Sequence, residues 1–232
     1  MEYNIIEEKE GLIFRNMKEF DPKHIFECGQ AFRWRLEEDS SYTAISRGRV
    51  INVKKEDQDI IFKNTDLEEF HKVWYNYFDL GRDYDRIKKE LSKDPVLKEA
   101  TDFGQGLRIL NQEPFETIIS FIISANNQIP RIKRSIELIS EHYGEEIPSK
   151  LRTEKYYSFP KAARLAQLDL EELKEISRVG FRADRIIESS KIIAQDGIDL
   201  DAIYDLSREE GKEVLMTLPG VGPKVSDCIL LF

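Results

Sequence analysis

The periodicity of hydrophobic and polar positions changes near residue 66 of the chain. Before that point, short segments alternate apolar and polar residues, which is the pattern of strands with one buried face. Charged, turn-like stretches at 37–41 and 54–59 separate these segments. We therefore predict a small antiparallel sheet in this region, with its clearest strands at 42–46, 50–53 and 59–63.

From residue 66 onward the apolar positions follow the 3.6-residue period of helices. The first helical patterns lie between residues 67 and 91, and beyond residue 102 we find no convincing strand pattern. Two apolar stripes there each predict a helix with one buried face. Their members are Phe115, Ile118, Ile119 and Ile122, and then Ile132, Ile136 and Ile139.

The second stripe also has recognisable ends. Pro130 suits the first turn of a helix, and Gly144 suits its C-terminal cap. Further helices are predicted at 160–167, 169–177, 182–195 and 207–217. The fold class is therefore α+β, with an antiparallel β-sheet domain and flanking helices over residues 1–101 and an all-helical domain over residues 102–232.

The composition agrees with a soluble globular protein, since 41% of the 232 residues are hydrophobic and 34% are charged. No apolar run has membrane-spanning length, and the start of the chain lacks the features of a signal peptide, so no membrane association is expected. Cys28 and Cys228 show no CxxC spacing and no paired histidines nearby. We therefore expect neither a zinc site nor a disulfide framework, and we place the protein in a reducing cytoplasm.

The formal charge of −9 argues against nucleic acid as a partner, because lysine and arginine drive binding to phosphates. Net charge averages over a whole surface, however, whereas binding needs one basic patch. Much of the acid lies in blocks at 169–175 and 208–210, which we interpret as solvated helix faces. The charge therefore leaves a nucleic-acid partner possible.

A Leu-Pro-Gly-Val-Gly turn at 218–222 lies between two helical patterns. Gly220 and Gly222 allow a tight turn around Val221, and Pro223 fits the first position of the second helix. Free backbone N–H groups at such a helix start favour an anion, and phosphate is the usual one. We interpret this segment as a phosphate-binding hairpin.

Lys224 follows the hairpin and stands beside the predicted phosphate site. A lysine needs its pKa lowered by roughly three units, about 4 kcal/mol, to act as a nucleophile near neutral pH. A helix dipole supplies about 0.3–1 kcal/mol, so desolvation in a pocket must supply the rest. From these residues alone, Lys224 is either a nucleophile or a simple phosphate contact.

Three further segments combine residues that suit nucleic acid with equally ordinary interpretations. Segment 123–134 has two adjacent asparagines followed by arginines. These side chains suit hydrogen bonds to base edges, or equally a turn followed by a solvated basic helix. Phe181, beside Arg182, suits a wedge in a duplex or a place in the core. Gly29 exposes its carbonyl to a ligand or marks a strand bend.

Taken in order, these segments resemble the 8-oxoguanine DNA glycosylase family of the helix–hairpin–helix superfamily. The resemblance covers nearly the whole chain. It rests chiefly on Gly-Gln-Ala-Phe-Arg-Trp at 29–34, Asn-Asn-Gln-Ile at 126–129, Gly-Phe-Arg-Ala at 180–183 and Val-Gly-Pro-Lys-Val-Ser-Asp-Cys-Ile at 221–229. It implies a TATA-binding-protein-like sheet domain packed on a helical domain, with the active site in the cleft between them.

The resemblance also implies a role for each matching residue. Lys224 would attack C1′ of the damaged nucleotide, displace the base and form a Schiff base, after which β-elimination nicks the strand. Gly29 would accept a hydrogen bond from the N7–H of 8-oxoguanine, and Cys228 would lie against the flipped base. The DNA contacts would be Asn126 in the vacated space, Phe181 as wedge, and Arg131 and Arg182 as readers of the orphaned cytosine.

The expected partner is double-stranded DNA containing oxidised guanine, bound by a monomer that needs no metal or organic cofactor. Gln128 and Pro130 differ from some relatives, and we expect little consequence. The family's catalytic aspartate and stacking aromatic would lie beyond Phe232, so we expect the chain to be truncated. Asp227 is too near Lys224 to substitute, and we expect it to serve its own helix. An alkylated-purine glycosylase and a non-catalytic DNA-binding module remain as alternatives.

Overall fold

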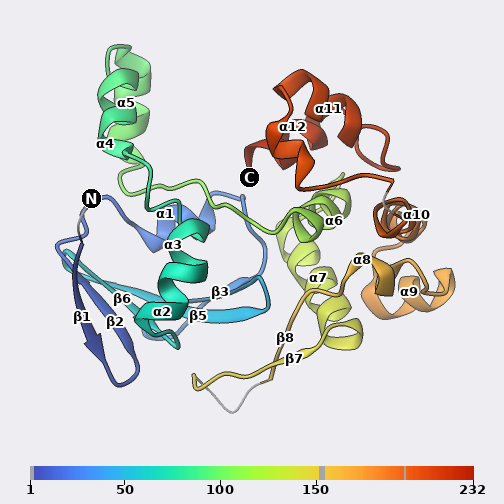
Figure 1. Cartoon of the computed structure of the whole chain (residues 1–232), viewed down its shortest axis with the longest axis horizontal. Coiled ribbons are helices and arrows are strands. Elements are labelled where there is room, and N and C mark those ends of the chain that lie inside the picture. Colours follow the sequence, from blue (N-terminus) through green and yellow to red (C-terminus); the bar gives the residue numbers. More distant parts are fainter. Residues whose placement is uncertain (1–2, 152–154, 196) are drawn as a thin grey trace. The chain divides into compact units, whose positions relative to one another are not determined.

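The computed structural model of the chain describes residues 3–151, 155–195 and 197–232. The chain forms two compact units (Figure 1). The first comprises Met1–Ile45, Arg49–Asn111 and Pro148–Glu154, and the second comprises Ser46–Gly48, Gln112–Ile147 and Lys155–Phe232. The boundary that the sequence suggests, between residues 101 and 102, lies inside α5 (Pro95–Phe103) of the first unit. Every helix in the described residues is too short or too polar to cross a membrane.

The first unit contains a six-stranded antiparallel sheet with the strand order β1-β2-β6-β5-β4-β3. The predicted strands at 42–46 and 59–63 coincide with β4 and β6. The predicted strand at 50–53 lies within the longer β5. In spatial order the strands are β1 (Asn4–Glu8), β2 (Gly11–Arg15), β6 (Asp59–Lys63), β5 (Arg49–Glu56), β4 (Tyr42–Ser46) and β3 (Trp34–Leu36).

The turn predicted at 54–59 is shorter in the structure. Strand β5 continues to Glu56, which pairs with Asp59 of β6, so only Asp57 and Gln58 form the turn. Charge at Lys54 and its neighbours suggested a loop, but a strand tolerates charged residues because alternate side chains point away from the core. Asp57 adopts a positive φ of 53°, as tight hairpin turns require.

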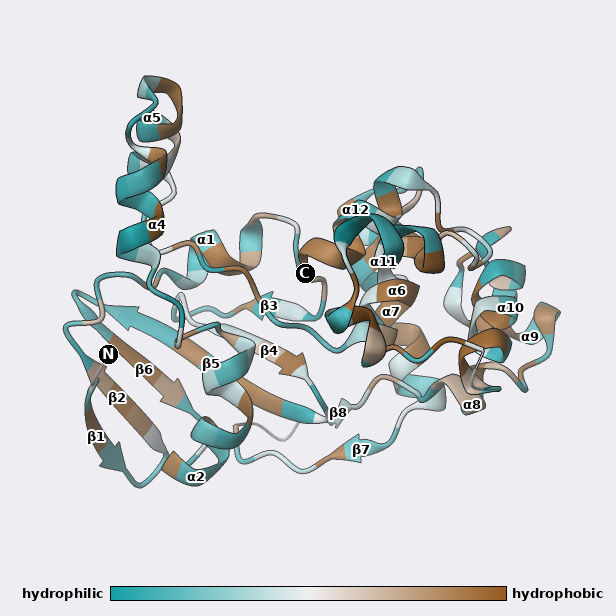
Figure 2. Ribbon diagram, turned by 45° about the horizontal axis from the view of Figure 1, so that its top comes forward, coloured by the Kyte–Doolittle hydropathy of each residue, from teal (hydrophilic) through white to brown (hydrophobic). Residues whose placement is uncertain are grey.

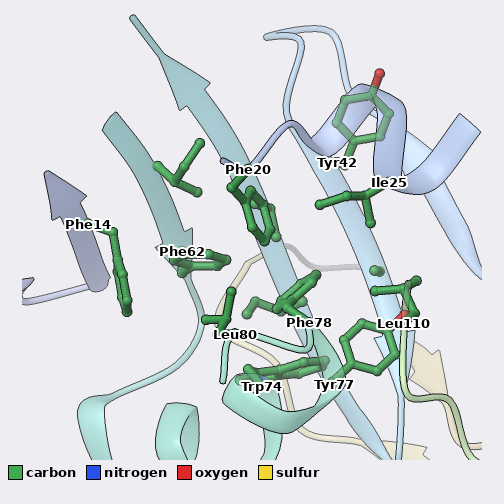
Figure 3. Packing of buried hydrophobic residues seen from close by; sticks show 14 of the residues in the cluster. Phe14, Phe20, Ile25, Tyr42, Phe62, Trp74, Tyr77, Phe78, Leu80 and Leu110 are labelled. Atoms are coloured by element: carbon green, nitrogen blue, oxygen red, sulfur yellow. The ribbon is translucent and has the colours of Figure 1, made fainter. Parts of the chain in front are cut away.

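Aromatic residues dominate the core of the first unit (Figure 3). Rings from the sheet meet rings from the helical segment that follows it, for example Phe62 with Phe70 at 4.8 Å between centroids. That segment consists of α2 (Leu67–Glu69), a π-helical turn (Phe70–Trp74) and α3 (Tyr75–Tyr77). Its apolar stripe is the one predicted from the sequence, and Trp74 is fully buried.

Helix α1 (Pro22–Glu27) lies in the region where the sequence suggested strands only. The prediction overlooked a complete start signal: Asp21 caps the helix by accepting hydrogen bonds from the backbone of Lys23 and His24, and Pro22 occupies the first turn. Helix α4 (Tyr84–Leu91) was expected from the spacing of Ile87 and Leu91.

The second unit is built around α6 (Pro114–Ser124), which is rich in hydrophobic residues (Figure 2) and almost entirely buried. It packs against α7 (Ile129–Tyr143), α10 (Arg182–Ala194) and α12 (Pro223–Leu231). Smaller elements complete the unit, namely α8 (Ala162–Leu165), α9 (Leu170–Ser177), a 3-10 turn (Ala202–Asp205) and α11 (Arg208–Leu215). Each predicted helix is therefore present, within a few residues of its predicted ends.

The prediction that no strand follows residue 102 is wrong in one place. Strands β7 (Glu146–Ile147) and β8 (Tyr156–Tyr157) form a small antiparallel pair. Two-residue strands show no periodicity in a sequence, because an alternation needs several residues to be recognised.

Candidate functional site

The helices of the second unit begin in two different ways. Among those with at least eight described residues, α6, α9 and α11 have a side chain that caps their first turn, from Glu113, Asp169 and Ser207. Helices α7, α10 and α12 begin at Gln128, Phe181 and Gly222 without such a cap. No side chain caps these starts, although the N–H groups of Arg182 and Ala183 in α10 already donate to the backbone carbonyls of Val179 and Gly180. The N–H groups at these starts that have no such acceptor favour an anion from outside.

The three uncapped helices start in the segments that the sequence suggests as nucleic-acid contacts. These are the asparagine turn (126–128), the Gly-Phe-Arg segment (180–182) and the hairpin (218–222). Each also carries a basic residue in its first turn, at Arg131, Arg182 and Lys224. A cation at a helix N-terminus is unfavourable within a monomer, since the macrodipole is positive there. A polyanion bound across these helix ends would be attracted both by the three basic side chains and by the helix dipoles.

Arg182 joins the first two of these helix starts. Its guanidinium donates hydrogen bonds to the carbonyl of Ala125, at 2.6 and 3.0 Å, and to that of Asn126 at 2.9 Å. The side chain is buried, and burial followed by the nearby charge of Arg185 lowers the pKa of Arg182. The asparagine turn is thus fixed by an arginine that sequence analysis placed against DNA.

The hairpin joins the same assembly through its turn. The backbone N–H of Val221 donates to the carbonyl of Leu218 at 3.1 Å, and Gly220 adopts a φ of 91° at the third position. With Pro219 at the second position, this is a type II turn. The Ser189 hydroxyl of α10 donates to the carbonyl of Pro219 at 3.0 Å, which ties the turn to α10.

The two hairpin glycines serve different purposes. A Cβ atom on Gly220 would lie 2.9 Å from Arg185 Cδ and 3.3 Å from Ile122 Cγ2, so Gly220 is required by its conformation and by close packing. Gly222 has an ordinary φ of −100°, and nothing lies within 4 Å of an added Cβ. The expectation that Gly222 is needed for the turn is therefore not supported, and its open side instead leaves room for a ligand to approach the backbone.

Lys224 lies in the first turn of α12 and is exposed. It makes no ion pair with the described residues of the second unit. Cys228 follows four residues later and is half-buried, so both side chains lie on one face of the helix. The ammonium is therefore available to an external ligand.

Asp227 belongs to the scaffold. Its carboxylate pairs with Lys212 at 2.7 Å and with Arg208 at 2.8 Å, both on α11. These two side chains, Lys212 foremost, lower the pKa of Asp227. The carboxylate thereby joins the two helices of the hairpin, rather than serving only its own helix as the sequence suggested.

Phe181 and Asn126 are both exposed, as residues that contact DNA must be. The side chain of Phe181 is 59% exposed, so the alternative that it packs in the core is wrong. Asn126 has a left-handed φ of 50°, held by the Arg182 hydrogen bond to its carbonyl. Arg131, in the first turn of α7, is exposed as well.

Gly29 lies in the first unit, directly after α1, with a φ of 88° and open space beside it. The buried Gln30 fixes this turn. Its amide group donates to the carbonyls of Ile25 and Arg108 and accepts from the backbone of Leu110, at 2.8–2.9 Å. This role of Gln30 is not visible in the sequence, because burial of a polar residue carries no signal in a single sequence.

Arg108 anchors the segment that Gln30 contacts. It is 1% exposed, and its guanidinium donates to the backbone carbonyls of Phe78, Glu19 and Asp79 at 2.7–3.0 Å. The same group lies 4.2 Å from the ring centroid of Tyr84. No group of three or more His, Cys, Asp or Glu side chains suited to a metal ion occurs in the described residues.

Two family descriptions match the chain in tandem. Residues 12–118 match the 8-oxoguanine DNA glycosylase N-terminal domain, and residues 119–223 match the HhH-GPD superfamily of base excision DNA repair proteins. The N-glycosylase/DNA lyase of Saccharomyces cerevisiae is 30% identical over 249 residues, which cover 96% of this chain and 65% of the yeast protein. The chain spans between 54% and 65% of the length of the curated N-glycosylase/DNA lyases that it matches.

Solved structures give the same result over the whole chain. The 8-oxoguanine glycosylase/lyase of Clostridium acetobutylicum in its apo-form is 45% identical with a TM-score of 0.95, over 100% of this chain and 81% of the other. Its complex with double-stranded DNA containing cytosine opposite 8-oxoguanine is 44% identical with a TM-score of 0.94, over 100% and 79% of the two chains. With the uncapped helix starts and the hairpin lysine, these matches establish that the chain belongs to the 8-oxoguanine DNA glycosylase family of the helix–hairpin–helix superfamily.

Proposed function

We propose that this chain excises 8-oxoguanine opposite cytosine from duplex DNA and cleaves the resulting abasic strand, with Lys224 as the nucleophile. The observation that carries the proposal is the position of Lys224. It is an exposed amine in the first turn of an uncapped helix, beside a hairpin whose Gly222 leaves the backbone open to a phosphate. The partner is double-stranded DNA bound by a monomer.

In the proposed reaction Lys224 is the nucleophile, and the proton transfers and the water are supplied from elsewhere. The neutral Nζ of Lys224 bonds to C1′, the C1′–N9 bond breaks with its electron pair on the base, and the base takes up a proton. Opening of the sugar ring gives an imine, removal of a C2′ proton breaks the C3′–O bond, and hydrolysis of the imine returns the lysine. Because Lys224 is exposed, the bound nucleotide must supply the desolvation that the free amine requires.

Base recognition is assigned to Gly29 and Cys228. The backbone carbonyl of Gly29 would accept a hydrogen bond from the N7–H of 8-oxoguanine, whereas guanine presents an N7 acceptor that would repel it. The open space beside Gly29 supports this role, since nothing lies within 4 Å of an added Cβ. Cys228 shares a helix face with Lys224 and would contact the flipped base.

The strand opposite the lesion is assigned to the exposed residues of the second unit. Asn126 would fill the vacated space, Phe181 would wedge the opposite strand, and Arg131 would read the orphaned cytosine. Arg182 can join this reading through the one guanidinium N–H that its bonds to Ala125, Asn126 and Val179 leave unused.

The test is base release from duplexes that differ at one position. We expect release of 8-oxoguanine, fastest opposite cytosine, with guanine left in place and no release by Lys224→Gln. Release of 8-oxoguanine by Lys224→Gln at the wild-type rate would overturn the proposed mechanism. Release of alkylated purines by that variant would favour the alternative, in which a carboxylate activates water.

A further inference from the structure

One aromatic ring in the second unit is approached by two cations. The guanidinium carbon of Arg182 lies 4.4 Å from the ring centroid of Phe181, and that of Arg185 lies 5.4 Å from it. A phenylalanine ring attracts a cation by about 0.5–1 kcal/mol at an exposed site. It cannot neutralise two guanidinium charges, so the pair carries uncompensated positive charge.

The two arginines differ in how their donors are used. Arg182 donates to backbone carbonyls within the unit, whereas Arg185 makes no hydrogen bond or ion pair with the described residues of the second unit. The adjacent Asp184 does not compensate it, since consecutive residues on a helix do not face each other. Arg185 therefore offers five N–H donors to an external group.

The position of Arg185 is nevertheless fixed. Its Cβ and Cδ atoms lie 3.3 and 2.9 Å from the place of a Gly220 side chain, so the aliphatic stem lies across the hairpin turn. One helical turn further along, Ser189 donates to the carbonyl of Pro219 on the same side of α10. The stem is thus held against the hairpin and the guanidinium lies over Phe181, with its N–H groups open to an external ligand.

The external group must be an anion. Two like charges over one ring raise the energy of the unbound state, and the charge of Arg185 is one cause of the lowered pKa of Arg182. Both arginines lie in the first turn of the uncapped helix α10, where the macrodipole also favours negative charge. An arginine fork matches the oxygens of a phosphate and can bind two of them together.

We propose that Arg185 binds a phosphodiester of duplex DNA, at a position between the hairpin and the wedge residue Phe181. The proposal rests on the proposed function only in taking DNA as the partner. Arg185 would extend the anion site of the hairpin along the backbone toward Phe181. It touches neither the base nor the reacting atoms, so its contribution is to affinity and register.

The test compares Arg185→Gln with Arg164→Gln, because Arg164 is also an exposed arginine over a ring, at 5.5 Å from the Tyr143 centroid, but lies on α8 and belongs to neither the hairpin nor the start of α10. Glutamine keeps the carbon atoms that lie on Gly220 and removes the charge. Dissociation constants are measured by fluorescence anisotropy over a series of salt concentrations, for one undamaged duplex and one with 8-oxoguanine opposite cytosine. Melting temperatures verify that each variant is folded.

Loss of one phosphate contact makes the negative slope of the logarithm of the association constant against the logarithm of the salt concentration shallower by about 0.9. This corresponds to about eightfold weaker binding at 0.1 M salt. We expect this change for Arg185→Gln on both duplexes, no change for Arg164→Gln, and partial recovery for Arg185→Lys, since an ammonium also binds phosphate. A slope for Arg185→Gln equal to wild type would overturn the proposal. So would an equal loss in the glutamine and lysine variants, which would indicate packing on the hairpin.

These outcomes are separate from those for the proposed function. Binding with an Arg185-dependent slope and no covalent adduct at Lys224 would support the phosphate contact and contradict the lysine mechanism. A covalent adduct at Lys224, together with a salt dependence that is the same in wild type and Arg185→Gln, would support the lysine mechanism and contradict the phosphate contact.

Discussion

Replacing Arg182 by alanine should destabilise the second unit and release the asparagine turn. The guanidinium makes hydrogen bonds to the carbonyls of Ala125, Asn126 and Val179, and it lies over Phe181. Hydrogen bonds from charged donors contribute about 1.5–3 kcal/mol each when buried. Ala125 is only half-buried and Asn126 is exposed, so water can replace part of what is lost.

The net cost is therefore smaller than the sum of the bonds. Taking about 1 kcal/mol for each carbonyl and about 0.5 kcal/mol for the ring contact, and subtracting the cost of burying the charge, gives about 2–3 kcal/mol for Arg182→Ala. For a chain of this size, that lowers the melting temperature by about 5–10 °C. Arg182→Lys should recover part of the loss, since an ammonium lacks the planar fork that reaches two carbonyls.

Urea unfolding followed by circular dichroism measures this difference, with Arg164→Ala as the matched control. Arg164 is exposed and stands over Tyr143, so its removal should cost no more than about 0.5 kcal/mol. A loss for Arg182→Ala as small as that of Arg164→Ala would refute the conclusion that Arg182 holds the turn.

Three further predictions concern the scaffold of the site. Gly220→Ala should lower the free energy of unfolding by about 1–2 kcal/mol, because Gly220 has a positive φ and is closely packed. Gly222→Ala should leave the melting temperature unchanged and weaken DNA binding. Equal losses of melting temperature in the two variants would contradict this distinction. The pKa of Asp227 is lowered in the folded chain, so its pairing stabilises the fold above the ordinary value of 3.8 and is lost as the pH falls through the lowered value. The stability deficit of Asp227→Asn in urea should therefore shrink as the pH is lowered through that range, and a constant deficit would contradict the pairing. Gln30→Ala should cost about 2 kcal/mol in thermal unfolding, since three buried hydrogen bonds are lost, and an unchanged melting curve would refute its anchoring role.

Local patterns predicted most of the fold. The stripes of α6 and α7 appeared as helices because their apolar residues recur with the right period, and the hairpin could be inferred because Pro219, Gly220 and Pro223 encode their own turn chemistry. Helix α1 and the pair β7–β8 were missed because they are short. Even so, the cap at Asp21 was visible in the sequence.

The contacts that arrange the site could not be predicted in the same way. Arg182 and Ala125 are 57 residues apart, so no periodicity relates them. Gln30 and Arg108 appear in a sequence as ordinary polar residues, and only the fold shows that they are buried against backbone carbonyls. Arg185 was inside a segment of interest, and its helical spacing from Phe181 was the signal that could have identified it.

The central claim, that Lys224 is the nucleophile, is tested most directly by borohydride trapping on a duplex with one abasic site, followed by peptide mass spectrometry. An abasic site presents the aldehyde to the amine without requiring recognition of the base. We predict a covalent adduct at Lys224 that Lys224→Gln does not form, while the variant still binds the duplex. An adduct of undiminished yield in Lys224→Gln, or one mapped to another lysine, would contradict the account.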